Sequence, residues 1–409
     1  MIALSTLLGT GFSYGHPYPE TERDASSDLD AFLQSFFHVF PHLQSREFFV
    51  FGESYAGMFV PSIAKYIMNA NQKAIASGNT DRRIIVPLAG AAIGNGWIDA
   101  TIQGPATIDY SWYHGLIDEP TRNAIHKIWE KCAQDPNFVL PPPFHPFTVQ
   151  DDCGIMWAIL QASGNPNAYD VTTWDPNVDQ VTFSSEAFFN DPKVKEMLHV
   201  TGPALEHYWH GCQAGSGRRQ RRNLREDDVV EEEDVLRHHR RLYMDNDRPI
   251  SVVPYIAELV DNGIPVLVYN GDRDMTTNMV GTELCLNGME WSGKDEWLDA
   301  PRGLWNVNDY PAGWAKEQGD LTFVVVYNSG HMVRIMELYA ATSLFGVFFE
   351  LTSHRVSSFD RYPTMLQKVP TTCSVVSLIR KALLTKRQSP PVTKDTMMKA
   401  KPQSIMRLC

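Results

Sequence analysis

The chain has 409 residues, of which 43% are hydrophobic, so it is long enough to bury a sizeable core. A formal net charge of −12 argues against nucleic acid as a partner, because phosphate backbones bind basic surfaces. No run reaches the roughly 18 apolar residues of a membrane span. Residues 1–8 are apolar but lack the basic start and cleavage site of a signal peptide. The composition therefore predicts a large globular protein.

The first stretch with a chemical signature is residues 48–57. Four apolar residues run into a turn of small residues that carries Ser54, and an amphipathic helical pattern follows. Strand, tight turn and helix in this order describe a nucleophile elbow, in which the serine backbone is strained. Gly52 and Ala56 flank the serine at positions where larger side chains would collide. An ordinary strand-to-helix turn remains the alternative, because short Gly/Ser motifs recur by chance.

Two later stretches weigh against that alternative. Residues 265–270 are typical of a buried strand and are followed by two acids, Asp272 and Asp274. Residues 321–327 are typical of a second buried strand and are followed by His331. A serine, an acid and a histidine thus each follow a predicted strand, in the chain order of the α/β-hydrolases. Open α/β sheets place their active sites at those strand ends.

Further motifs in the same order make a specific resemblance. They lie at residues 9–14 (Gly-Thr-Gly-Phe-Ser-Tyr), 52–57 (Gly-Glu-Ser-Tyr-Ala-Gly), 93–99 (Ile-Gly-Asn-Gly-Trp-Ile-Asp), 271–275 (Gly-Asp-Arg-Asp-Met) and 330–333 (Gly-His-Met-Val). Weaker matches lie at residues 167–171 and 198–200. On these residues the chain resembles the serine carboxypeptidases from about Gly9 to Phe349.

This resemblance implies an α/β-hydrolase fold with a central, mostly parallel sheet and an inserted cap region. Residues 1–99 would form the N-terminal part of the core, with its upstream strands missing, and residues 100–250 the cap. Residues 251–350 would complete the core with a closing helix at 335–349. A basic tail at 351–409 is predicted to be disordered, since residues 352–409 hold 11 basic and 2 acidic side chains.

Within the cap, residues 215–248 form a charged linker. Between Arg218 and Arg248 there are nine arginines and nine acids, too many charges for the segment to bury itself. A solvated loop is one interpretation. The other is a linker excised at the arginine cluster, because some members of the family mature to two chains. Cys132, Cys153 and Cys212 lie in the cap, where the resemblance implies disulfides, although their pairing cannot be read from sequence.

The resemblance also implies roles for particular residues. Ser54 would be the nucleophile, His331 its base, and Asp274 rather than Asp272 the acid that orients the histidine. The separation of Asp274 and His331 along the chain (331 − 274 = 57) matches the family pattern.

Two substrate-facing roles complete the implied site. The backbone N–H of Tyr55 would be one oxyanion donor, and Glu53 would recognise the terminal carboxylate of the substrate as half of a carboxyl pair. The second donor and the partner of Glu53 would lie upstream, and the family's Asn-Gly-Gly-Pro-Gly motif is absent from the sequence. The sequence therefore predicts a truncated amino end or an incomplete gene model.

The function implied is a serine-type carboxypeptidase that releases C-terminal amino acids from peptides through an acyl-enzyme, with no metal or cofactor. Its partners would be peptide or protein C-termini, and a homodimer is left open. The alternatives are a carboxypeptidase-like acyltransferase or esterase, or an inactive truncated homologue with a binding role. The implied location is the secretory pathway, either vacuolar or lysosomal, or extracellular.

Overall fold

A computed structural model describes residues 11–13, 19–133, 154–174, 186–206, 208–209, 251–307 and 310–333. All of them belong to one compact unit, Ser5–Val356. Several predictions lie outside the described residues: the charged linker at 215–248, the closing helix at 335–349, the basic tail at 351–409, and two of the three cap cysteines, Cys153 and Cys212.

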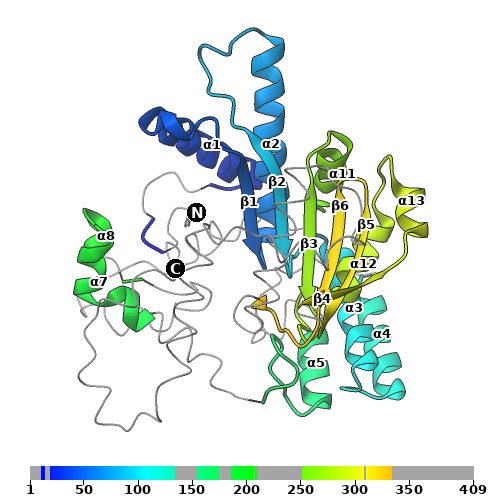
Figure 1. Cartoon of the computed structure of the whole chain (residues 1–409). Coiled ribbons are helices and arrows are strands. Elements are labelled where there is room, and N and C mark those ends of the chain that lie inside the picture. Colours follow the sequence, from blue (N-terminus) through cyan, green and yellow to red (C-terminus); the bar gives the residue numbers. More distant parts are fainter. Residues whose placement is uncertain are drawn as a thin grey trace. The chain divides into compact units, whose positions relative to one another are not determined.

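The described residues build one six-stranded sheet in the order β1-β2-β3-β6-β5-β4 (Figure 1). Its strands are β1 (Phe48–Glu53), β2 (Leu88–Gly94), β3 (Val266–Gly271), β4 (Gly303–Val307), β5 (Tyr310–Gln318) and β6 (Leu321–Val326). The first four strands in this order run parallel, and β5 and β4 continue the sheet antiparallel. The predicted mostly parallel sheet is therefore confirmed.

Helices precede β1 and occupy the connections between the parallel strands. They are α1 (Glu22–Val39), η1 (Pro41–Leu43), α2 (Ala56–Ala76), α3 (Ala100–Tyr113), α4 (Glu119–Ala133), α5 (Ile155–Ala162), α7 (Pro192–Met197), α8 (Pro203–Glu206), α11 (Val253–Asp261), α12 (Met279–Gly288) and α13 (Lys294–Asp299). Figure 1 shows α3, α4 and α5 beyond the carboxyl ends of the parallel strands. Among the described helices, none combines the length and the apolar character that crossing a membrane requires.

The core follows from the apolar runs of the sequence. Every residue of β3 and β6 is buried, as expected of central parallel strands that are covered on both faces. Helix α2 packs against this sheet, and four of its apolar positions at helical spacing are at most 3% exposed. Those positions are Val60, Ile63, Ala64 and Ile67. The sheet and α2 thus form a rigid base for the turn between β1 and α2.

Candidate active site

Ser54 occupies the turn between β1 and α2 with φ of +67°, in the left-handed region that side-chain-bearing residues avoid. Three backbone hydrogen bonds hold it there. Its N–H donates to the carbonyl of Gly94 at 2.9 Å, and its carbonyl accepts from Gly57 at 2.9 Å and Trp97 at 3.0 Å. The strained turn expected of a nucleophile elbow is therefore present, pinned by the end of β2 and the loop that follows.

Small neighbours make this turn sterically feasible. A Cβ on Gly52 would lie 2.4 Å from the Cβ of Ala56 and 2.8 Å from Cγ2 of Val60. A Cβ on Gly57 would lie 2.5 Å from both the N and the O of Trp97. The prediction that larger side chains beside the serine would collide is thus confirmed for Gly52.

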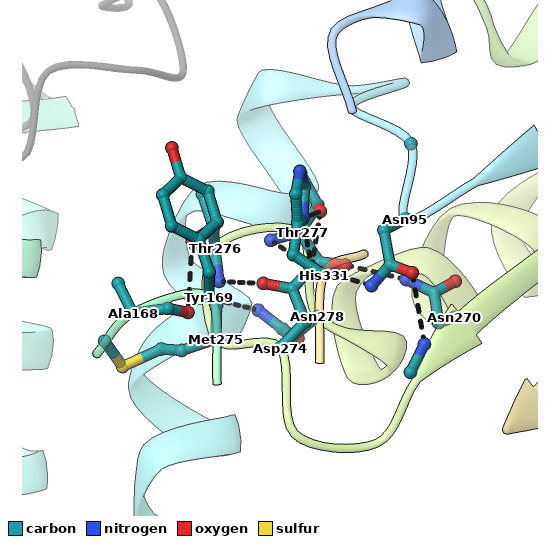
Figure 2. Close-up of polar contacts among 12 residues, drawn as sticks. Asn95, Ala168, Tyr169, Asn270, Asp274, Met275, Thr276, Thr277, Asn278 and His331 are labelled. Atoms are coloured by element: carbon teal, nitrogen blue, oxygen red, sulfur yellow. Dashed lines mark hydrogen bonds and ion pairs between the residues drawn. The ribbon is translucent and has the colours of Figure 1, made fainter. Parts of the chain in front are cut away.

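Asp274 is fully buried and its carboxylate is surrounded by donors (Figure 2). Its Oδ2 accepts from Nδ1 of His331 at 2.8 Å, from Nδ2 of Asn95 at 2.7 Å and from Oγ1 of Thr277 at 2.7 Å. Its Oδ1 accepts from the N–H of Thr276 at 2.9 Å. Because a buried charge is tolerated only when it is paired and hydrogen-bonded, this shell accounts for a carboxylate at this depth.

Asp272, the other acid of the same turn, lies against a different partner. Its Oδ1 accepts from the backbone N–H of Ser329 at 3.1 Å, and burial raises its pKa. The side chain of Asp272 therefore links the turn after β3 to the backbone of the turn after β6. The imidazole of His331 instead bonds Asp274, the acid that the resemblance selects.

His331 is only 5% exposed, and its environment favours the protonated ring. Burial lowers the pKa of the imidazole, but the charge and hydrogen bond of Asp274, with the charge of Glu53, outweigh it, so the pKa is raised. With Nδ1 bonded to Asp274, the ring leaves Nε2 as its proton acceptor. This is the arrangement of a histidine that takes a proton from a nucleophile and is stabilised once charged.

Asn95 connects these parts, and sequence reasoning did not assign it a role. Its φ is +40°, and its N–H donates to the carbonyl of Tyr269 at 2.7 Å. Its Oδ1 accepts from the N–H of Gly271 at 3.1 Å while Nδ2 donates to Asp274. One buried amide therefore links the end of β2 to the end of β3 and to the acid. Its presence in the Gly-Asn-Gly motif was the available signal.

The sheet order brings the predicted residues to one edge. Ser54 follows β1, Asn95 follows β2, Asp274 lies beyond β3 and His331 lies beyond β6, and these are four neighbouring parallel strands. The carboxyl ends of parallel strands share one edge of a sheet, which is where ligands bind in open α/β folds.

Two other predicted residues flank the serine. Glu53 is the last residue of β1 and is partly buried, and its charge reaches the imidazole of His331. Tyr55 caps the start of α2, so the backbone next to the serine lies at the positive end of that helix dipole.

The fold and this arrangement of strand ends define an α/β-hydrolase. Residues 1–350 match the serine carboxypeptidase family, and the chain belongs to that family. The yeast structure described as Kex1(delta)p, a prohormone-processing carboxypeptidase from Saccharomyces cerevisiae, has the same fold. It matches with a TM-score of 0.59 and 23% identity, and the match covers 82% of this chain and 72% of that one.

Curated relatives agree with this membership. The pheromone-processing carboxypeptidase KEX1 of Paracoccidioides brasiliensis (strain Pb03) is 28% identical over 349 residues, covering 80% of this chain and 50% of the relative. A serine carboxypeptidase-like protein of Oryza sativa subsp. japonica is 30% identical over 341 residues, covering 81% and 71% respectively. The chain thus spans about half the length of the fungal relatives it matches.

Proposed function

We propose that this protein is a serine-type carboxypeptidase, releasing C-terminal amino acids from peptides through an acyl-enzyme. One observation carries the proposal: a buried Asp274 holds Nδ1 of His331 at 2.8 Å, at the sheet edge where Ser54 sits in a strained turn. Family membership supplies the reaction class, and this geometry supplies the residues for it.

Ser54 is the nucleophile and His331 the general base. The serine Oγ attacks the last peptide carbonyl while Nε2 of His331 takes its proton. The tetrahedral intermediate collapses, the C–N bond breaks, and His331 returns the proton to the departing amino acid. A water molecule, activated by the same histidine, then hydrolyses the serine ester and restores the free hydroxyl.

Asp274 and Tyr55 stabilise the charges that this sequence creates. Asp274 fixes the tautomer of His331 and stabilises the imidazolium, which agrees with the raised pKa of that ring. The backbone N–H of Tyr55, at the start of α2, donates to the oxyanion. A helix amino end also favours negative charge, by about 0.3–1 kcal/mol at exposed sites.

Glu53 gives the site its preference for a free carboxyl terminus. It immediately precedes the serine, and its charge already acts on His331, so it lies within electrostatic range of the reacting groups. When a second carboxyl, which the resemblance places upstream, shares a proton with Glu53, the pair can donate to an anionic terminus at acidic pH. Peptide or protein C-termini are therefore the proposed partners, and acidic conditions should favour their turnover.

A disulfide supports a location in the secretory pathway. Cys132, at the end of α4, is disulfide-bonded. Disulfides persist in oxidising compartments and are rare in the cytosol. Secretion, or delivery to a vacuole or lysosome, is the location we propose for the protein.

The central test is the nucleophile. A fluorophosphonate probe should label the wild-type chain at Ser54, and Ser54→Ala should lose both labelling and peptide cleavage, by about 10⁶ in kcat. A C-terminally amidated peptide should be a poor substrate beside the free acid. Labelling that survives Ser54→Ala would overturn the assignment. Cleavage of esters or transfer to an added alcohol, without release of amino acids, would instead identify an esterase or acyltransferase.

A further inference from the structure

Residues 167–173 form a short loop that closes on itself after α5. The N–H of Asn167 donates to the carbonyl of Thr173 at 2.9 Å, and Thr173 donates to the carbonyl of Asp170 at 3.0 Å. The side chain of Asn167 accepts from the N–H of Tyr169 at 3.0 Å. Val171 is buried in a cluster with residues of α3, α4 and α5. This 167–173 loop is therefore a fixed element, although it belongs to no regular helix or strand.

Two consecutive carbonyls of this loop bind the two turns that carry the acid and the base. The carbonyl of Ala168 accepts from the N–H of Met275 at 3.0 Å and from Oγ1 of Thr276 at 3.2 Å. The carbonyl of Tyr169 accepts from the N–H of His331 at 2.8 Å. Figure 2 shows Ala168 and Tyr169 beside the acid turn and the histidine. A segment outside the sheet thus fixes the separation of Asp274 and His331.

The loop is in close contact with both turns. The N–H of Val171 donates to the carbonyl of Arg273 at 3.0 Å. A Cβ on Gly330 would lie 2.4 Å from the carbonyl oxygen of Tyr169 and 3.0 Å from the Cβ of Asp170. Only glycine allows this approach at residue 330. The loop and the histidine turn are therefore packed directly against each other.

The side chain of Tyr169 adds a contact to the imidazole itself. Its ring centroid lies 4.9 Å from that of His331, with the two planes inclined at 48°. The hydrogen bond to Asp274 fixes Nδ1, but it does not by itself stop the ring from tilting about that bond. The tilted aromatic ring packed against the imidazole supplies the missing constraint, because aromatic pairs prefer definite mutual orientations.

We propose that Tyr169 is a positioning residue, whose ring and backbone carbonyl hold His331 so that Nε2 points at the serine hydroxyl while Nδ1 stays on Asp274. The inference rests on the proposed function, because it concerns the orientation of that base. In this proposal the aromatic ring of Tyr169 positions the imidazole, and the hydroxyl group of Tyr169 does not.

The test uses the reaction of Ser54 with a small fluorophosphonate, which needs the base but makes no use of a peptide-binding pocket. Tyr169→Phe keeps the ring and should react at the wild-type rate. Tyr169→Ala and Tyr169→Leu should react about 10- to 100-fold more slowly, since misplacing a catalytic group by about 1 Å costs up to 10² in rate. Peptide kinetics should show the same loss in kcat, with little change in KM.

The pH profile of labelling separates positioning from a merely structural role. Within the part of the chain that the structure describes, the charged groups acting on His331 are Asp274, from the turn after β3, and Glu53, from the end of β1. Neither changes in these variants, while Tyr169→Ala opens the ring to water. Burial lowers the pKa of His331, so losing the cover should raise the apparent pKa of labelling. Tyr169→Phe should leave that value unchanged.

Thermal unfolding of each variant shows whether the fold is intact, and Tyr169→Leu serves if the alanine variant is unstable. Wild-type labelling rates in folded Tyr169→Ala or Tyr169→Leu overturn this inference alone. So does a defect confined to the KM for peptides, which would make Tyr169 a substrate contact. A wild-type chain that does not react at Ser54 overturns the proposed function, and this inference with it.

Discussion

The two halves of the candidate site are built on opposite principles. The acid and base, Asp274 and His331, are almost fully buried, and side-chain hydrogen bonds from several elements fix them. Ser54 is partly exposed, and backbone bonds alone hold its main chain at an unfavourable φ of +67°. One half is stabilised by satisfied polar groups, and the other stores strain.

This difference determines how substitutions should act in each half. A buried, fully bonded network tolerates little change, because each removed partner leaves another polar group unpaired. A strained turn behaves in the opposite way, because a residue suited to its backbone relieves strain while removing the chemistry. Substitutions in both halves of the site test this contrast.

The largest effect should come from the acid. Asp274→Asn presents an amide to Nδ1 of His331 and favours the wrong tautomer, so kcat should fall by about 10⁴. Asp272→Asn is the matched control in the same turn. It keeps an oxygen for the N–H of Ser329 and should cost less than about tenfold. Peptide and ester kinetics measure both variants, and equal losses would show that Asp274 is not the orienting acid.

The second-largest effect should come from Gly57, which packs against the backbone of Trp97. Gly57→Ala places a Cβ within 2.5 Å of backbone atoms of Trp97, which cannot rotate away. The free energy of unfolding should fall by about 1–3 kcal/mol, together with serine labelling. Gly288 in α12 has no atom within 4 Å of a built Cβ, so Gly288→Ala is the control and should be neutral or slightly stabilising. Chemical denaturation of both variants provides the comparison.

The third prediction concerns how glycine changes the free energy of unfolding at two positions with a positive φ. Ser54→Gly should be more stable than Ser54→Ala by about 1 kcal/mol, because only glycine adopts a positive φ without penalty. Asn95 has a φ of +40°, yet its side chain bonds Gly271 and Asp274. Asn95→Gly should therefore be destabilising despite its relaxed backbone. If Ser54→Gly were more stable than Ser54→Ala and Asn95→Gly were also more stable than the wild-type chain, the proposed contrast would be wrong.

The smallest effect should be a pH shift. The charge of Glu53 raises the pKa of His331, so Glu53→Gln should lower it, and the neutral base should persist to lower pH. The acidic limb of the pH profile of ester kcat/KM should then move to lower pH. Peptide binding should extend to higher pH, because an amide still donates where a carboxylate cannot. Glu47→Gln, at an exposed position before β1, should leave both limbs in place.

Much of the fold could be predicted because it depends on local signals. The apolar runs at residues 265–270 and 321–327 became β3 and β6 to within a residue. The elbow was readable because Gly52 and Ala56 are needed wherever a serine takes that conformation. The mostly parallel sheet follows from such strands separated by helices.

What could not be read depends on distant partners. Strand β5 contains proline, glycine and charged residues, and it forms because β4 and β6 pair with it. The bond from Asn95 to Asp274 spans 179 residues, and no local pattern encodes it. Exposure is equally unreadable from sequence, since Trp112 and Trp129 pack against the cluster of α3, α4 and α5, whereas Tyr113 is 68% exposed.

The pairing of β2 with β3 also affects when the site can assemble during synthesis of the chain. The nucleophile turn leaves the ribosome first, yet its proposed base follows 277 residues later (331 − 54). At 5–20 residues per second, that delay is roughly 15–55 s. During this delay the serine has no base. Strand β2, whose last residue accepts a hydrogen bond from the N–H of Ser54, also lacks its sheet partner β3. The proposed catalytic residues can therefore come together only after His331 has been synthesised, 277 residues behind the serine (331 − 54).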